Sequence, residues 1–243
     1  YAKRGMEIHT GARFQSAKVG KSGVNVTFTD RQGASHSNDV DFVLSAVGRV
    51  PNSSGVGLES VGVKVSERGF IVVDELMRTN VPGVYAIGDV AGNQLLAHKA
   101  SHEGIVCVEH IAGKGHGTVD YGNVPNCTYC SPEVASVGLT EEQAKAKGYD
   151  VEVGKFPWAG VGRAVAAGHT DGFVKIIRDK QYSEILGAHI VGPHATELIA
   201  EFVLGRHLES TVEEMERAMH PHPTLSEGVS EAALAALGRP IHI

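Results

Sequence analysis

The chain has 243 residues, of which 42% are hydrophobic and 21% charged, a composition that favours one large or two ordinary globular domains and argues against disorder. A formal net charge of −6 without a dense Lys/Arg cluster argues against nucleic-acid binding, and no apolar run approaches the roughly 20 residues that span a bilayer. Three cysteines do not build a disulfide scaffold, so we expect a reducing, cytoplasmic setting.

The first 30 residues are predicted to be mostly strand. Lys3-Arg4-Gly5 is typical of a helix end with its glycine stop. Residues 21–23 predict a hairpin turn. The segments that predict short strands are 6–10, 12–19 and 24–29. A domain that opens on a helix end and a few strands is an odd independent unit, so we expect the chain to be part of a longer protein.

The apolar run over residues 41–48 predicts a buried strand that ends at Gly48. A glycine at the carboxyl end of such a strand lets a nucleotide approach the backbone in α/β proteins. A simple turn at Gly48 is the alternative.

Residues 79–89 combine a Val-Pro-Gly-Val turn with a short predicted strand over 84–87 that ends at Gly88. Gly88 leaves room for a ligand on the backbone, and Asp89 offers an acceptor for ribityl or ribose hydroxyls. A helix is predicted over 95–113, with Leu96, Ala100, Val106 and Ile111 near one face. Its first turn offers backbone N–H groups to a ligand. A strand, turn and helix without a ligand is the alternative.

The last 120 residues predict a second module after a linker over 113–122. The predicted strands are 134–139, 151–156, 172–178 and 185–191. The predicted helices begin at capping boxes at Thr140 and Thr211, cover 195–207, and include the Ala/Leu run 232–237. This order predicts an α+β fold, in which helices face an antiparallel sheet.

The stretch from His220 to Glu227 places His222 five residues before Glu227, with Pro223 and a Thr-x-x-Glu capping box at Thr224 between them. A turn at Pro223 would bring the two side chains within hydrogen-bond reach. A carboxylate on one ring nitrogen fixes the tautomer and makes the other nitrogen a better base. A surface proline turn followed by a capped helix is the alternative.

Two further patterns could bind metal or carry redox chemistry. Cys127 and Cys130 form a Cys-x2-Cys pair, but no second cysteine pair accompanies it. His220 and His222 could form half of a metal site, but a third ligand at suitable spacing is missing. We therefore predict no metal site. Cys107, within the long helix, is predicted to be buried packing.

Several segments resemble, in order, motifs of the pyridine nucleotide-disulfide oxidoreductases: 47–52 (Val-Gly-Arg-Val-Pro-Asn), 79–89, 95–104, 131–138, 172–175, 187–199 and 220–227. The stretch 95–104 is most similar to the dihydrolipoamide dehydrogenase branch of the family. The resemblance implies the end of an NAD-binding domain over 1–46, a returning segment of the FAD-binding domain over 47–120, and an interface (dimerisation) domain over 121–243.

The resemblance also assigns cofactor contacts. It implies that the ribityl chain of FAD contacts the Asp89 side chain, beside Gly88. The backbone that would contact the flavin ring is that of Leu95, Leu96, Ala97 and His98. Gly48 is implied to lie near NAD.

By the same resemblance, His222 is the catalytic base and Glu227 the carboxylate that orients it. In the family this pair reaches the redox disulfide of the other subunit of a homodimer. There it takes a proton from protein-bound dihydrolipoamide on the lipoyl domain of a 2-oxoacid dehydrogenase complex, with NAD as the acceptor.

The chain departs from the family in having no Gly-x-Gly-x-x-Gly fingerprint and no Cys-x4-Cys pair. We therefore expect it to be the C-terminal half of the enzyme, inactive alone and a poor binder of FAD. A related flavin enzyme, of the glutathione reductase or soluble transhydrogenase type, is one alternative. A stand-alone dimerisation module without catalysis is the other.

Overall fold

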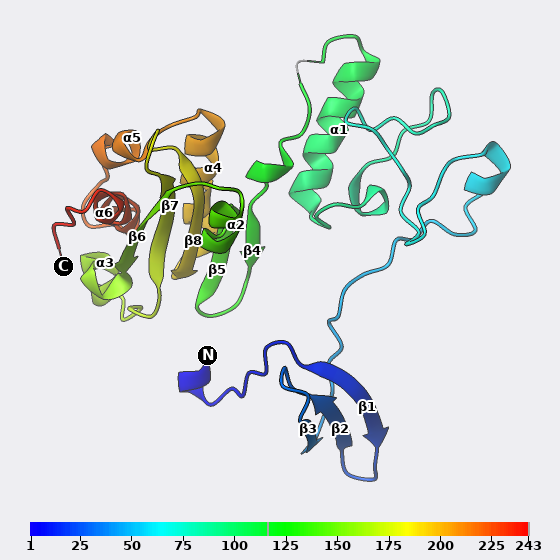
Figure 1. The fold of residues 1–243 in the computed structure, drawn as a ribbon, viewed down its shortest axis with the longest axis horizontal. Helices are drawn as coiled ribbons and strands as arrows, with labels where there is room; N and C mark the ends of the chain where they lie inside the picture. The colour runs from blue at the N-terminus through cyan, green and yellow to red at the C-terminus, as the bar shows by residue number, and fades with distance from the viewer. Residues whose placement is uncertain (116, 243) are drawn as a thin grey trace. The chain divides into compact units, whose positions relative to one another are not determined.

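The computed structural model describes residues 1–115 and 117–242, and it divides into two compact units, Tyr1–Pro51 and Asn52–Ile243. Figure 1 shows the course of the chain. This division does not test the predicted domain boundaries at 46/47 and 120/121, which stay predictions. In the described part of the chain, none of the helices combines the length and the apolar character that crossing a membrane requires.

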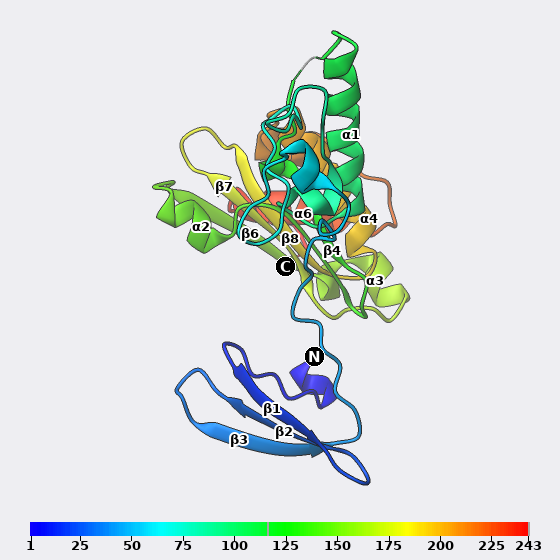
Figure 2. The same cartoon turned by 90° about the vertical axis from the view of Figure 1, so that its right-hand side faces the viewer.

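The first unit is a three-stranded antiparallel sheet in the order β1-β2-β3 (Figure 2). Its strands are β1 (Arg13–Val19), β2 (Val24–Thr29) and β3 (Ser35–Val40). The first two and their hairpin confirm the prediction. A short 3-10 helix, η1 (Ala2–Arg4), ends at Gly5 in the left-handed conformation with φ 85°, which confirms the predicted helix stop.

Two strand predictions in this unit are wrong, and one strand was missed. Residues 6–10 and 41–48 form no strand, whereas the polar segment 35–40 does. β3 lacks apolar alternation, but its backbone pairs residue by residue with β2. The run 41–48 has no paired strand among the described residues, and a strand needs a partner for its N–H and C=O groups.

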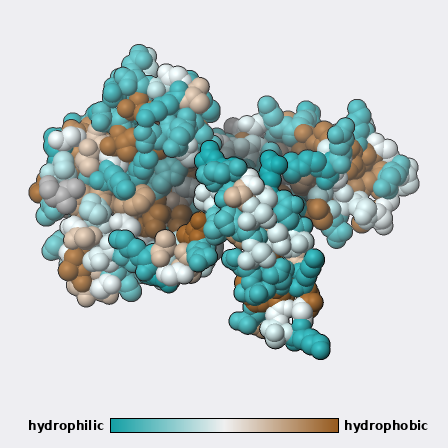
Figure 3. Space-filling view, turned by 60° about the horizontal axis from the view of Figure 1, so that its bottom comes forward, coloured by the Kyte–Doolittle hydropathy of each residue, from teal (hydrophilic) through white to brown (hydrophobic). Residues whose placement is uncertain are grey.

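The apolar side chains of that run are consequently open to solvent. Phe42 is 91% exposed and Leu44 92% exposed. Figure 3 shows, for one face of the chain, apolar side chains interrupting a mostly polar surface. Exposure on this scale is unusual for a run with the composition of a buried strand.

Residues 52–115 are mostly loop around a small core of Val63, Ile71 and Ala86. They contain the 3-10 helices η2 (Leu58–Val61) and η3 (Gly88–Ala91) and the helix α1 (Ala97–Ile111). The strand predicted over 84–87 is wrong, because only Tyr85 forms a bridge, to Arg78. The helix prediction is confirmed. Of the predicted linker 113–122, residue 116 lies outside the described residues.

The buried face of α1 differs from the predicted one. Its buried residues are Lys99, Glu103 and Cys107, which recur every four positions. The apolar Ile105 and Ile111 are more than half exposed instead. Burial of Cys107 confirms the prediction for that residue. The helix therefore turns a charged pair inward, which the apolar periodicity did not indicate.

The remaining residues form a five-stranded antiparallel sheet in the order β4-β5-β8-β7-β6, which follows the short helix η4 (Tyr121–Asn123). The strands are β4 (Asn126–Thr128), β5 (Glu133–Gly138), β6 (Val151–Pro157), β7 (Phe173–Asp179) and β8 (Ile185–Gly192). The helices are α2 (Glu141–Ala146), α3 (Gly162–Ala166), α4 (Ala195–His207), α5 (Val212–Arg217) and α6 (Glu227–Ala236), and the 3-10 turn η5 (Trp158–Gly160) precedes α3. The predicted α+β fold is confirmed here; β4, η5 and α3 were not predicted.

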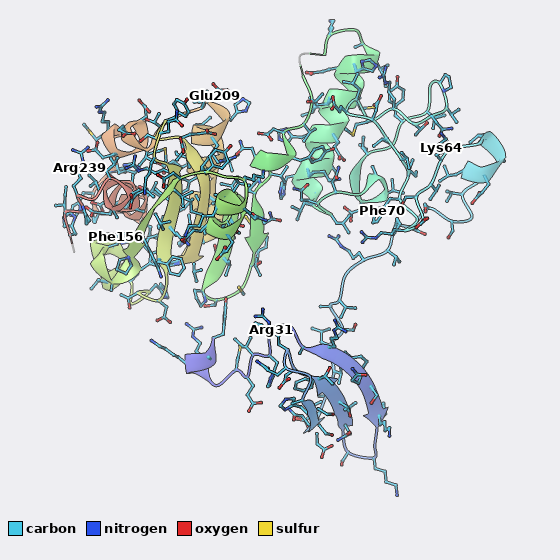
Figure 4. All side chains as sticks on the ribbon, viewed as in Figure 1. Arg31, Lys64, Phe70, Phe156, Glu209 and Arg239 are labelled. Atoms are coloured by element: carbon cyan, nitrogen blue, oxygen red, sulfur yellow. The ribbon has the colours of Figure 1, made fainter. Side chains whose placement is uncertain are left out.

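The main core lies between one face of this sheet and the helices α4, α5 and α6. Phe156 of β6, labelled in Figure 4, is fully buried in it. Gly154 of the same strand lies against the backbone of α6, where an added Cβ would collide with the Ala232 carbonyl oxygen. This contact fixes α6, and with it the first residue of α6, Glu227, against a rigid sheet.

Candidate active site

The predicted His–Glu pair is formed at the start of α6. The ring nitrogen Nδ1 of His222 lies 2.8 Å from Oε1 of Glu227. The second carboxylate oxygen, Oε2, accepts the backbone N–H of Thr224 at 2.9 Å. Because an ionised carboxylate only accepts hydrogen bonds, Nδ1 carries the proton and Nε2 holds the lone pair in the neutral ring. The geometry therefore presents Nε2 as a proton acceptor.

The two members of the pair differ in exposure. The His222 side chain is 77% exposed, whereas that of Glu227 is 26% exposed. Burial would raise the pKa of Glu227, but the Thr224 N–H and the His222 ring outweigh it and hold this pKa below its usual value. The carboxylate therefore stays charged and stabilises an imidazolium whenever His222 takes up a proton.

The predicted capping box at Thr224 is half formed. Glu227 accepts the Thr224 N–H, but α6 begins at Glu227, and the Thr224 hydroxyl donates to the Pro221 carbonyl at 2.6 Å. The threonine thus closes the turn that carries His222 rather than capping the helix.

A second His–Glu pair lies two residues upstream, and sequence reasoning missed it. His220 is only 8% exposed; its Nε2 lies 2.8 Å from Oε1 of Glu201, and its Nδ1 lies 2.8 Å from the Ala218 carbonyl. Both neighbours are hydrogen-bond acceptors, an arrangement that favours the doubly protonated, positively charged ring. The hydrogen bond to Glu201 raises the pKa of His220 against the opposing effect of burial. This pair ties the turn to α4.

The predicted flavin-contacting residues lie together on the second unit. Gly88 is buried with φ 77°, and a Cβ there would sit 3.3 Å from that of Ala100, so only glycine fits without strain. Asp89 follows it in η3 and is exposed. Leu95 and Leu96 are half-buried before α1 begins at Ala97.

These residues fit the polyhydroxyl chain and ring edge of a flavin. Leu96 precedes α1 and supplies no side-chain cap, and the first turn contains no acidic residue. The exposed residues Ala97 and His98 begin that turn, whose N–H groups lack acceptors within the helix. Gln94 keeps its Oε1 buried without a hydrogen-bond partner in the described part of the chain, as expected where a ligand supplies the donor. His98 Nε2 lies 2.9 Å from the Pro125 carbonyl.

Sequence reasoning gave no role to the buried residues behind this loop. Lys99 and Glu103 of α1 form an ion pair of 3.1 Å, and both contact the backbone of Gly88. A Lys and a Glu four residues apart is the one signal that could have found them. The same spacing is common on exposed helix faces, so burial had to be known first.

Gly48 belongs to the first unit, in an exposed stretch with φ 124°. Its predicted contact with NAD stays a prediction.

The Cys-x2-Cys pair does not have the surroundings of a reactive dithiol. Burial raises the pKa of the Cys127 thiol, and the nearby carboxylates of Glu133 and Glu197 raise it further. The Cys130 sulfur lies 3.2 Å from the Pro132 carbonyl. Among the residues that the structure describes, no group of three or more His, Cys, Asp or Glu side chains could hold a metal ion.

Comparison with known proteins identifies the family of the chain. The model of the pyridine nucleotide-disulphide oxidoreductases matches residues 1–104, and the model of that family's dimerisation domain matches residues 124–233. The chain belongs to this family. The five-stranded sheet with His222 and Glu227 is thus the dimerisation domain of a pyridine nucleotide-disulphide oxidoreductase, as the resemblance predicted.

Relatives of this oxidoreductase chain are named dihydrolipoyl dehydrogenase. That of Rhizobium etli is 49% identical over 239 residues, which are 98% of this chain and 49% of the relative. That of Bacillus subtilis is 45% identical over 241 residues, which are 99% of this chain and 51% of the relative. The chain spans about half the length of the curated relatives it matches.

Solved structures share the fold. LpdA from Mycobacterium tuberculosis matches with a TM-score of 0.84 at 31% identity, over 96% of this oxidoreductase chain and 50% of that chain. The Cu(II) complex of RclA, an HOCl-induced flavoprotein disulfide reductase from Escherichia coli, matches with a TM-score of 0.82 at 26% identity, over 91% of this chain and 49% of that chain.

Proposed function

We propose that the chain is the C-terminal half of a dihydrolipoamide dehydrogenase, which oxidises protein-bound dihydrolipoamide to lipoamide with NAD as the acceptor. The observation that carries the proposal is the His222–Glu227 pair at 2.8 Å, with Nε2 on the open side of the ring. The names of the curated relatives support the choice of substrate. The domain assignment to 1–46, 47–120 and 121–243 belongs to the same proposal.

In this function His222 handles protons. Nε2 takes the proton of a dihydrolipoyl thiol, and the resulting thiolate attacks one sulfur of the redox disulfide, which forms a mixed disulfide and displaces the other sulfur as a thiolate. Glu227 stabilises the imidazolium and keeps the ring oriented. Bound FAD and NAD supply the electron transfer from the dithiol. The disulfide lies outside this chain, on the partner subunit of a homodimer.

For FAD, we propose the contacts given by the second unit. The Asp89 carboxylate accepts hydrogen bonds from the ribityl hydroxyls, next to the side-chain-free Gly88. The backbone of Leu95, Leu96, Ala97 and His98 meets the edge of the flavin ring. Lipoyl domains of 2-oxoacid dehydrogenase complexes are the proposed partners, in a reducing, cytoplasmic setting.

His222→Gln in the full-length protein tests the proposal. Glutamine keeps a polar side chain but cannot take up the thiol proton, so dihydrolipoamide oxidation is expected to slow by about 10²- to 10⁴-fold while the flavin stays bound. Stopped-flow flavin reduction by dihydrolipoamide measures the step, and the flavin absorbance of the purified variant is the control. Retained reduction rates would contradict the role as base, and loss of flavin would indicate a structural role.

A related flavin disulfide reductase is the second candidate, and the structural likeness to RclA favours it. Turnover of dihydrolipoamide against glutathione disulfide by the full-length protein separates the two. The isolated 243-residue chain is expected to show neither activity, since the redox disulfide is absent from it. Turnover by the isolated chain would contradict the assignment as half of an enzyme.

A further inference from the structure

The Lys99–Glu103 ion pair is the most deeply buried charged group of the second unit. The two side chains are 0% and 1% exposed, and Nζ of Lys99 lies 3.1 Å from Oε2 of Glu103. Burying two charges costs more than burying apolar side chains of the same size, and a pure packing role would be met as well by an apolar pair. The contacts of the pair indicate what it does.

All three donors of the Lys99 ammonium are used. Besides Glu103, the ammonium donates to the carbonyls of Gly88 at 3.1 Å and Gly92 at 2.9 Å. These carbonyls lie at the two ends of η3, the turn that contains Asp89: Gly88 is its first residue and Gly92 follows its last. One ammonium therefore holds both ends of the turn.

Glu103 completes the hold on Gly88 and connects it to the dimerisation domain. Its Oε2 accepts the Gly88 N–H at 2.7 Å, so Gly88 is bound through both of its backbone groups. Its Oε1 accepts the Tyr121 hydroxyl at 2.7 Å. Burial and this carboxylate raise the pKa of Tyr121 to about 12, which keeps the hydroxyl a donor.

Tyr121 in turn lies in η4, which is tied to the dimerisation domain by Asn123. The Asn123 amide donates to the Val203 carbonyl of α4 at 2.9 Å and accepts from Arg206 at 3.1 Å. Hydrogen bonds, joined through the backbone of η4, therefore lead from the backbone beside Asp89 to α4.

We propose that Lys99, Glu103 and Tyr121 are positioning residues for the cofactor: they fix the backbone of Gly88 so that the Asp89 carboxylate is held where the ribityl chain binds. This inference rests on the proposed function, because FAD is the ligand. The role in ligand binding explains why two charges are buried here although their burial is unfavourable in free energy. Lys99 and Glu103 hydrogen-bond to the backbone of Gly88 and act through Asp89.

A double-mutant cycle in the full-length protein tests this. The four proteins are wild type, Lys99→Met, Asp89→Asn and the double variant, and the measurement is the FAD dissociation constant by titration of apoprotein. Each single substitution is expected to raise this constant by about tenfold, which corresponds to the loss of one charge-assisted hydrogen bond. In the Lys99→Met background, Asp89→Asn is expected to add little, because the carboxylate is already displaced.

Lys145→Met is the matched control. Lys145 of α2 pairs with Glu141 at the same spacing of four residues, but its side chain is 58% exposed. It is expected to leave FAD affinity unchanged.

Tyr121→Phe keeps the test valid if Lys99→Met does not fold, because it deletes only the Tyr121 hydroxyl that donates to Glu103. It is expected to shift the visible spectrum of the bound flavin and to weaken FAD binding about threefold.

The outcomes are distinct. Additive effects of Lys99→Met and Asp89→Asn, or unchanged FAD affinity and spectrum in Tyr121→Phe, would overturn the positioning role while leaving the proposed function intact. A wild-type full-length protein that binds no FAD would overturn both. Non-additivity with an unaffected Lys145→Met control supports the inference.

Discussion

The pairs Lys99–Glu103 and His222–Glu227 have similar separations, 3.1 and 2.8 Å, but opposite surroundings. The first lies wholly inside the protein and binds the backbone around Gly88. The second lies at the surface, with its histidine largely in solvent. Burial decides their roles, since a buried pair cannot lose one partner without leaving a charge unsolvated, whereas an exposed pair can exchange protons with a substrate. The His220–Glu201 pair lies between these extremes.

The largest effect on stability is expected from the buried pair. Lys99→Met leaves the Glu103 carboxylate buried without its cation, and the free energy of unfolding is expected to fall by about 3–5 kcal/mol. Urea unfolding of the full-length protein at fixed FAD concentration measures it. Lys99→Met with Glu103→Leu removes both charges and is expected to recover part of the loss. If Lys99→Met lowered the free energy of unfolding no more than Lys145→Met does, burial of the pair would not increase its effect on stability.

An intermediate effect is expected from Glu201→Gln, which removes the charged partner of His220. The loss should be about 1.5–3 kcal/mol near pH 6. Because folding raises the pKa of His220, the stabilisation is fully present below its unfolded pKa of about 6.5 and is lost as pH rises through the folded value. The difference from wild type, measured by unfolding between pH 6 and 9, should therefore shrink with rising pH. A pH-independent difference would indicate that the charge on His220 plays no part.

The smallest effect on stability is expected from His222→Gln, although its effect on catalysis is the largest proposed. The side chain is mostly in solvent, so the free energy of unfolding should change by less than about 0.5 kcal/mol. Glu227→Ala should cost more, because it also removes the oxygen that accepts the Thr224 N–H. Equal losses for the two variants would show that the Thr224 contact is not stabilising.

The elements that the sequence predicted well are those whose signal is local. The capping boxes at Thr140 and Thr211 begin the helices α2 and α5, and the helix predicted over 195–207 matches α4. Along most of β5 and β6, more buried and less buried residues alternate. In each case a few neighbouring residues carry the whole signal.

The wrong predictions concern segments whose structure depends on partners. The run 41–48 has the composition of a central strand, but pairing needs a second strand, and none lies beside it among the described residues. The polar segment 35–40 becomes a strand because β2 offers its edge in register. Propensity could not predict either outcome, since inter-strand hydrogen bonds decided both.

By itself, the sequence predicted the contact between His222 and Glu227, because a proline turn within a spacing of five residues can bring the two side chains within hydrogen-bond reach. Only the tertiary structure decided that Glu201, nineteen residues before His220, fixes that turn to α4, and that Lys99 and Glu103 face inward. The physical reason is that burial and long-range partners are set by packing. The same Lys-x-x-x-Glu spacing would be a weak surface pair if η3 and η4 did not cover it.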